Sequence, residues 1–176
     1  TIVDQYVACD ALGMSAEAPV IAVQEMETKE FLGGAAIVAN HLQSLGANCH
    51  FISVVGDDQP AHFLEQQLLQ QGVQSSLLID KGRPTTFKIR YMVNNQKLFR
   101  VSRLQDHSIS KSLEEQIIGH LKQIGPDLDG IVVSDFVYGV VTNRLLQSII
   151  EIAKKYNIKL FGDLQCSSQI GNVLKF

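Results

Sequence analysis

GGAAIVANHLQSLGANCHFISVVGDD, residues 33–58, contains the pattern that decides the fold. After Gly34 the apolar side chains recur at helical spacing and Gly46 follows as a C-terminal cap, which predicts a helix over residues 35–45. The β-rich run at residues 49–55 then predicts a strand that ends at residues 56–58. A helix that leads through a short turn into a strand is the repeating unit of an α/β fold.

The same alternation continues along the chain. Ser112 with Glu115 is typical of a capping box at the start of a helix, and Thr142 is typical of a helix cap further on. Two short apolar runs predict strands at residues 131–133 and 159–161. Strands that alternate with helices predict right-handed βαβ units and a mostly parallel sheet covered by helices on both faces.

Residues 85–101 interrupt this rhythm, because they show no helical spacing. The polar residues Thr86, Lys88 and Arg90 alternate with apolar ones, and the extended pattern resumes after residues 94–96. This pattern predicts a β-hairpin with an asparagine-rich turn.

The hairpin is expected to leave the main sheet and to pair with a strand at residues 19–23. The two would form a lid over the C-terminal edge of the main sheet, with lid strands around residues 14–26 and 83–103. An ordinary hairpin at the edge of the main sheet is the alternative that these residues leave open.

Composition bounds the classes of protein to consider. With 176 residues, 45% of them hydrophobic, the chain can bury the core of one domain and is not a disordered polar segment. A formal net charge of -3 argues against a nucleic-acid binder, and no apolar run approaches the roughly 20 residues of a membrane span. Three scattered cysteines, no signal peptide and no zinc-ligand spacing favour a cytoplasmic protein without a zinc site.

Several positions are candidates for ligand binding. Gly33 and Gly34 open a helix, where free amides attract anions and hydroxyls, although small residues at a helix start are also good packing. They match neither the dinucleotide fingerprint nor the P-loop, so a nicotinamide-dependent oxidoreductase has no support. Asp135 and Asp163 follow strands, where carboxylates either hold ligands or cap helices.

The polar face of the hairpin is the remaining candidate. If Thr86, Lys88 and Arg90 point inward, with Arg100 beside them, they form a basic clamp suited to a phosphorylated substrate. If they point outward, they are only the solvated face of a strand.

Taken in order, these segments resemble the PfkB (ribokinase-like) carbohydrate kinases, and within them the heptose-7-phosphate kinase group, the kinase part of ADP-heptose synthases. The most specific strings are S-x-E-A-P-V at residues 15–20 and R-P-T-T-x-K-x-R at residues 83–90. The resemblance also covers L-G-G-A-A at residues 32–36, V-G-D-D at residues 55–58 and S-D-F at residues 134–136.

The resemblance implies a ribokinase-like three-layer α/β/α sandwich with a small β-sheet lid that often mediates dimers. It implies transfer of a phosphoryl group from ATP, with Mg²⁺, to a hydroxyl of a sugar, such as a heptose 7-phosphate, with a homodimer formed through the lid. The substrate-binding positions that it implies are Asp4, Gly33, Gly34, Lys88, Arg90, Asp135 and Asp163. The first three would hold sugar hydroxyls, the two cations would lie near the substrate, and the two last carboxylates would face the cleft between sugar and nucleotide.

This sequence also departs from the family pattern. Ile37 stands where the family usually has asparagine, and Tyr138 and Gln165 stand where the heptose group has lysine. The G-A-G-D string that carries the catalytic base is absent, so no catalytic residue is expected in this chain. Residues 1–176 are therefore expected to be the N-terminal part of a sugar kinase domain that is inactive alone. The alternative is a non-catalytic sugar-binding or regulatory module on the same fold.

Overall fold

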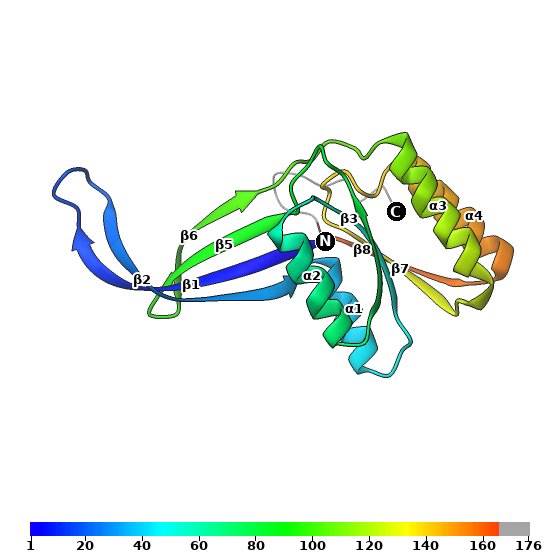
Figure 1. Cartoon of the computed structure of the whole chain (residues 1–176), viewed down its shortest axis with the longest axis horizontal. Helices are drawn as coiled ribbons and strands as arrows, with labels where there is room; N and C mark the ends of the chain where they lie inside the picture. The colour runs from blue at the N-terminus through cyan, green and yellow to red at the C-terminus, as the bar shows by residue number, and fades with distance from the viewer. Residues whose placement is uncertain (166–176) are drawn as a thin grey trace.

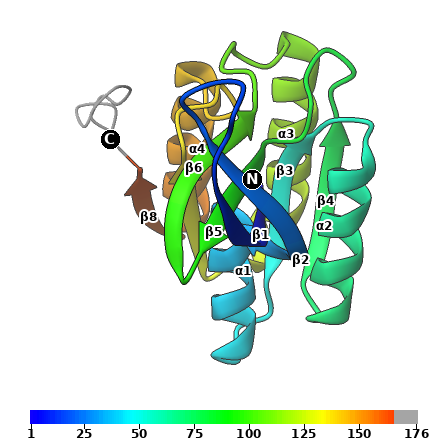
Figure 2. The same ribbon diagram turned by 90° about the vertical axis from the view of Figure 1, so that its left-hand side faces the viewer.

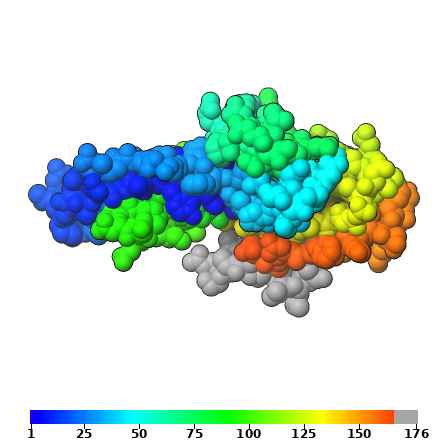
Figure 3. Space-filling view, turned by 90° about the horizontal axis from the view of Figure 1, so that it is seen from below, coloured from blue at the N-terminus to red at the C-terminus, as the bar shows by residue number. Residues whose placement is uncertain are grey.

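A four-stranded sheet projects from the helical part of the molecule in the computed structural model, which describes residues 1–165 (Figure 1). We call this sheet the lid. Its strands, in spatial order, are β2 (Ile21–Gly33), β1 (Ile2–Met14), β5 (Phe87–Val93) and β6 (Gln96–Arg103). β1 pairs antiparallel with β2 and parallel with β5, and β6 returns antiparallel to β5. The space-filling view shows the lid as a narrow arm beside a broader body (Figure 3).

The predicted hairpin, β5–β6, is present in the lid, which is a sheet separate from the β-strands that pack among the helices. Asn94 and Asn95 have φ values of 48° and 63°, the left-handed pair that a two-residue hairpin turn requires. The hairpin pairs with β1, however, and not with a strand at residues 19–23.

The strand bounds of the lid also differ from the predicted ones. Residues 15–20 form the turn between β1 and β2, so the strand expected around residues 14–26 lies at Ile21–Gly33 instead. Most residues of β2 are exposed, and the run at residues 24–30 is polar or charged on both faces except at Met26. A strand that is solvated on both faces lacks the alternation by which strands are predicted from sequence.

The body contains two parallel strand pairs. β3 (His50–Val55) pairs with β4 (Gln74–Ile79), and β7 (Gly130–Asp135) pairs with β8 (Lys159–Leu164). The mostly parallel sheet that was predicted is thus present as two separate pairs within the described residues. A cavity of about 280 Å³ lies between the two pairs, and the strand residues that line it belong to β3 and β7.

Helices pack on two sides of these strands. They are α1 (Ala35–Ser44), α2 (Gln59–Gln70), α3 (Lys111–Ile124) and α4 (Asn143–Tyr156), with the short 3₁₀ helix η1 (Gly125–Asp127) after α3. Phe51 and Val55 of β3 belong to the core formed with α1, α2 and the base of the lid, whereas Val54 belongs to the core formed with α3 and α4. Because neighbouring strand residues point to opposite faces, β3 lies between two helical layers. Figure 2 looks along the lid toward these layers.

The starts of α3 and α4 are capped by short polar side chains. Thr142 caps α4, as predicted, and accepts a hydrogen bond from the amide of Leu145 at 3.1 Å. The predicted capping box at Ser112 is wrong, because Ser110 is the cap of α3 and accepts from the amide of Leu113 at 3.3 Å. Ser110 has the extended backbone of a cap, whereas Ser112 already lies inside the helix.

Glu114 ties these two helices together. Its carboxylate is only 5% exposed and accepts hydrogen bonds from the Thr142 hydroxyl and, at 2.9 Å, from Nη1 of Arg144. The hydrogen bond from Thr142, followed by the contact with Arg144, lowers the pKa of Glu114. A carboxyl group whose pKa is lowered by folding stabilises the protein above its unfolded pKa, and this stability is lost as the pH falls through the folded pKa.

We therefore expect Glu114→Gln to lower the free energy of unfolding at pH 7 by about 2 kcal/mol, the order of a charged hydrogen bond. The difference from the parent should shrink at acidic pH, below the unfolded pKa of about 4.3. Urea unfolding at pH 7 and at pH 3.5 measures both effects. Glu115→Gln is the matched control, because the exposed Glu115 contacts the same arginine at 3.2 Å. An equal effect of the two variants, or no change of the difference with pH, would contradict this account.

Among residues 1–165, no helix is both long enough and apolar enough to span a membrane.

Candidate functional site

A partly buried ion pair joins two lid strands near the base of the lid. Arg90 Nη1 on β5 donates a hydrogen bond to Asp4 Oδ1 on β1 at 2.5 Å, and the two side chains are only 16% and 19% exposed. The guanidinium also lies 5.1 Å from the centre of the Tyr6 ring. An aromatic face and a carboxylate hold Arg90 from two sides, so its position is well defined.

These side chains share one face of the lid with Lys88. Asp4 lies beside Lys88 in the parallel register, and Arg90 lies beside Arg100 in the antiparallel register. Residues that are directly paired across strands point to the same side of a sheet. We call the face formed by Asp4, Tyr6, Lys88, Arg90 and Arg100 the polar lid face. The alternation of residues 86–90 therefore builds a clustered, partly buried surface, and Lys88 and Arg90 are not merely a solvated strand face.

Gly33 lies against the carboxylate of Asp4. A Cβ atom at position 33 would stand 2.5 Å from Asp4 Oδ2 and 3.3 Å from the carbonyl oxygen of Ile2. Only glycine leaves room for the carboxylate there. Gly34 follows with a φ of 56° and precedes α1, which has no side-chain cap, so the first amides of this helix are left without a capping side chain beside Asp4.

Lys88 connects the lid to the segment that follows β7. Its side chain is buried, with an exposed fraction of 9%, and its Nζ lies 5.2 Å from the centre of the Tyr138 ring and 6.0 Å from that of Phe136. Within residues 1–165, none of the ion pairs includes Lys88. The lid and the body therefore meet around a buried cation.

The two carboxylates predicted at strand ends lie on neighbouring strands. Asp135 is 2% exposed, ends β7 and accepts from the amide of Val137 at 2.9 Å. Asp163, on β8, accepts from the Ser134 hydroxyl at 3.2 Å and from Nε2 of Gln165 at 3.1 Å. Asp135 does not cap a helix, since α4 begins only after Thr142, so helix capping does not explain this residue.

The described residues contain no cluster of three or more His, Cys, Asp or Glu side chains that could hold a metal ion. Asp135 and Asp163 both lie near the carboxyl ends of adjacent parallel strands, the edge at which α/β proteins bind ligands. Asp163 is registered with Ser134 and Asp135 with Leu164, so the two carboxylates belong to opposite faces of the strand pair.

A family model described as "pfkB family carbohydrate kinase" matches residues 2–169. The chain belongs to this family.

The relatives of this pfkB-family chain include longer proteins. It is 39% identical over 163 residues to the bifunctional protein HldE of Campylobacter jejuni, and 36% identical over 156 residues to the HldE of Helicobacter acinonychis. These alignments cover 92% and 88% of this chain but 34% of each relative. The chain thus spans about a third of the length of the curated relatives that it matches.

Solved structures agree on the fold. The chain superposes on a structure titled as a putative phosphofructokinase from Staphylococcus aureus with a TM-score of 0.65 at 14% identity, covering 92% of this chain and 52% of that one. It superposes on phosphofructokinase-2 from Escherichia coli, solved in complex with substrates and products, with a TM-score of 0.64 at 16% identity, covering 91% and 50%. The chain therefore has the ribokinase-like fold of these kinases, as part of a domain.

In this pfkB-family chain the R-P-T-T string has a structural role that sequence reasoning missed. Arg83 is 7% exposed, binds Asp80 at 2.9 Å and donates to the carbonyl oxygens of His107 at 2.7 Å and Tyr138 at 3.0 Å. Thr85 accepts a hydrogen bond from the amide of Gly56 at 2.9 Å. These contacts fix the loop before β5 and the segment after β7, which together place Lys88 and Tyr138. The R-P-T-T string marked these residues as noteworthy, but His107 and Tyr138, which Arg83 binds, are too distant in sequence to be predicted as its partners.

Proposed function

We propose that this chain carries the sugar-binding part of an ATP-dependent kinase that phosphorylates a hydroxyl of a sugar phosphate, such as a heptose 7-phosphate. The observation that carries the proposal is the partly buried Asp4–Arg90 pair beside Gly33. A carboxylate held by an arginine and faced by a side-chain-free backbone can accept hydrogen bonds from sugar hydroxyls in a fixed geometry. The membership of the pfkB family and the likeness to HldE proteins support this choice.

Acidic and basic residues of the site would bind different groups of the sugar phosphate. Asp4 would accept from hydroxyls, and the backbone at Gly33 and Gly34 would let the sugar approach the start of α1. Lys88 and Arg90 would neutralise a phosphate group that the sugar already carries. The lid would exclude water from the reacting hydroxyl, since phosphoryl transfer depends mainly on positioning and charge stabilisation.

ATP and Mg²⁺ are the cofactors of this proposal. Mg²⁺ is commonly bound by one or two carboxylates together with substrate phosphates, so either Asp135 or Asp163 would suit it. They belong to opposite faces of the β7–β8 pair, so one of them, and not both, would hold the ion. When bound, the ion would supply positive charge to the phosphoryl group. The 176 residues contain no G-A-G-D string, so we assign no general base to this chain.

The test is ADP release by the full-length gene product, with ATP, Mg²⁺ and a panel of free and phosphorylated sugars. We expect release with at least one sugar phosphate and little with its unphosphorylated form. No ADP release with any sugar would refute the kinase proposal.

The second candidate is a non-catalytic sugar-binding or regulatory module. Tyr138 and Gln165 favour it, because each removes a cation from the cleft relative to the heptose group. Calorimetric binding of a sugar phosphate by a full-length protein that releases no ADP would select this alternative. Cytoplasmic location, expected from the sequence, stays a prediction for either function.

We also propose that the tip of the β1–β2 hairpin contacts a second copy of the protein. Leu12 and Met14 are 65% and 66% exposed, and Ile21, paired with Met14 across the hairpin, is 58% exposed. Exposed apolar side chains gathered on an arm that projects from the body are typical of a contact surface.

The paired substitution Leu12→Glu and Met14→Lys is therefore expected to convert a dimer into a monomer in light scattering. Gln24→Lys, at an exposed polar position of the same arm, should leave the dimer intact. A monomeric parent, or a variant that remains dimeric, would contradict the proposed contact.

A further inference from the structure

We propose that Tyr138 is a specificity-determining residue, whose ring positions the Lys88 ammonium to bind the phosphate group of the sugar. This inference rests on the proposed function. It assigns Tyr138, which stands where the heptose group has lysine, the task of holding Lys88 in place.

The environment of Lys88 is the first argument. Its ammonium lies among two aromatic rings, 5.2 Å from the centre of Tyr138 and 6.0 Å from that of Phe136. The neighbouring carboxylate of Asp4 is engaged by Arg90 at 2.5 Å. A buried ammonium needs a negative partner or hydrogen-bond acceptors, and aromatic faces supply only part of this stabilisation. The Lys88 ammonium can therefore still bind an anionic group of the substrate.

The backbone around Tyr138 is the second argument. Its carbonyl oxygen accepts a hydrogen bond from the buried Arg83 at 3.0 Å. Val137 has a φ of 61°, which is rare for a β-branched residue, and its amide donates to Asp135 at 2.9 Å. At Gly139, a Cβ atom would stand 2.0 Å from the carbonyl oxygen of His107. A strained turn that is clamped from several sides fixes the ring in place before a ligand binds.

The substitution has a chemical consequence. A lysine at position 138 would add a further charge beside those of Lys88 and Arg90, whereas a tyrosine ring orients the charge of Lys88 and adds an apolar wall beside it. The affinity for the phosphate then depends on how well Lys88 is held. Tyr138 acts through Lys88 and is a positioning residue.

The test compares Tyr138→Leu with Tyr138→Phe in the full-length protein, using the sugar phosphate that gives the most ADP. We expect Tyr138→Leu to raise KM for this sugar phosphate about tenfold while kcat changes less than twofold, because the cation–π contact is lost. Tyr138→Phe keeps the ring and should bring KM back to within twofold of the parent. KM for ATP should be unchanged in both. Tyr156→Leu is the matched control, since it removes a Tyr–Lys contact of 4.8 Å on α4.

Nuclear magnetic resonance supplies a second readout that needs no activity. The ε-methylene signal of Lys88 should be shifted upfield by the rings in the parent and in Tyr138→Phe, and this shift should be reduced in Tyr138→Leu. The inference is overturned if the signal is the same in all three proteins, if KM is unchanged in Tyr138→Leu, or if Tyr138→Phe is as impaired as Tyr138→Leu. A parent that releases no ADP with any sugar refutes the kinase function instead, and the signal of Lys88 still tests the positioning.

Discussion

Asp4→Ala is expected to lower kcat/KM for the sugar about 100-fold in the full-length protein, mainly through a higher KM. The variant loses the carboxylate that would accept the sugar hydroxyls, and it leaves the guanidinium of Arg90 without the partner that it binds at 2.5 Å. Truncating one member of a buried, hydrogen-bonded charge pair typically costs about 2–5 kcal/mol. Because this pair is partly exposed, we take the lower end of that range, and a 100-fold loss corresponds to about 2.7 kcal/mol. Initial rates of ADP release at varied sugar concentration measure the effect.

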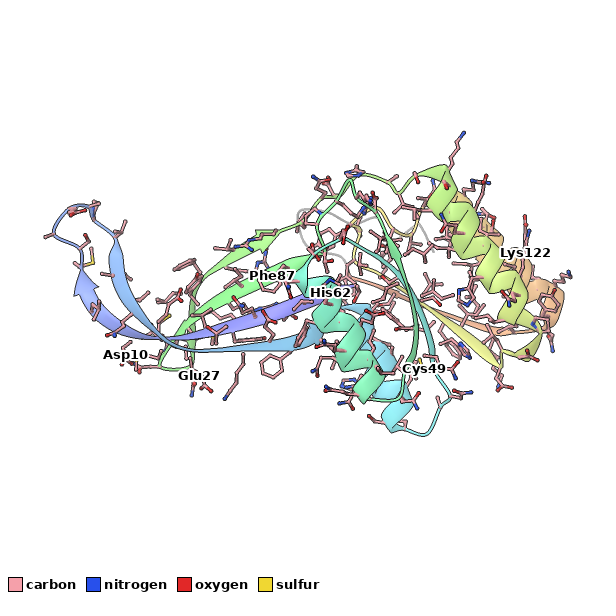
Figure 4. All side chains as sticks on the ribbon, viewed as in Figure 1. Asp10, Glu27, Cys49, His62, Phe87 and Lys122 are labelled. Atoms are coloured by element: carbon pink, nitrogen blue, oxygen red, sulfur yellow. The ribbon has the colours of Figure 1, made fainter. Side chains whose placement is uncertain are left out.

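Two variants separate binding from folding. Asp10→Ala removes an exposed carboxylate from the same strand, farther out along the lid, and should leave KM unchanged (Figure 4). Asp4→Asn keeps the shape but not the charge, and should fall between the parent and the alanine variant. An unchanged KM in a folded Asp4→Ala protein would remove Asp4 from the proposed sugar site.

Gly33→Ala is expected to produce a loss of similar size by a different route. The new methyl group would stand 2.5 Å from Asp4 Oδ2 and 2.9 Å from its Cγ, which is closer than non-bonded atoms approach. The carboxylate must therefore move out of its contact with Arg90, or the backbone of β1 must shift. Overpacking of this kind costs about 1–3 kcal/mol, which should also lower the thermal midpoint by several degrees, of the order of 2–4 °C per kcal/mol at this chain length.

A double variant gives the sharpest form of this prediction. If the clash with Asp4 is the cause, Gly33→Ala should cost much less activity in an Asp4→Ala background than in the parent, because the carboxylate is absent there. Gly119→Ala is the matched control, since nothing lies within 4 Å of a Cβ at that helical position, and it should stabilise α3 slightly. Fully additive losses in the double variant would show that Gly33 acts independently of Asp4.

The parts of the fold with local signals were predictable. The helix at residues 35–45 follows from apolar spacing and a capping glycine, and the β5–β6 turn follows from Asn94 and Asn95. β2 was misplaced because its polar and charged run at residues 24–30 shows no alternation. The separation of the parallel strands into two pairs depends on packing between distant segments, which no local pattern encodes.

The candidate site, too, depends on contacts between distant segments that no local pattern predicts. The spacing of Lys88 and Arg90 predicts that they share a face, but not which way the face points. Their partners decide that point, and they are remote: Asp4 lies 86 residues from Arg90, and the Tyr138 carbonyl lies 55 residues from Arg83. The family resemblance identified Asp4 and Gly33 separately, whereas their close approach is a property of the folded chain. The roles of these residues in substrate binding stay predictions.

The two strands of the lid hairpin pair from Ile2 and Gly33 at the root to Met14 and Ile21 at the tip. β1 also pairs with β5 from Val3 to Cys9, so the inner part of the hairpin, which carries Asp4, is held on both sides. Beyond Cys9, β1 has only β2 beside it among residues 1–165, and the register between these two strands shifts at two places along β1. Bending of the outer hairpin, as when a partner binds the apolar tip, is therefore absorbed beyond Cys9 and leaves Asp4 in place beside Arg90.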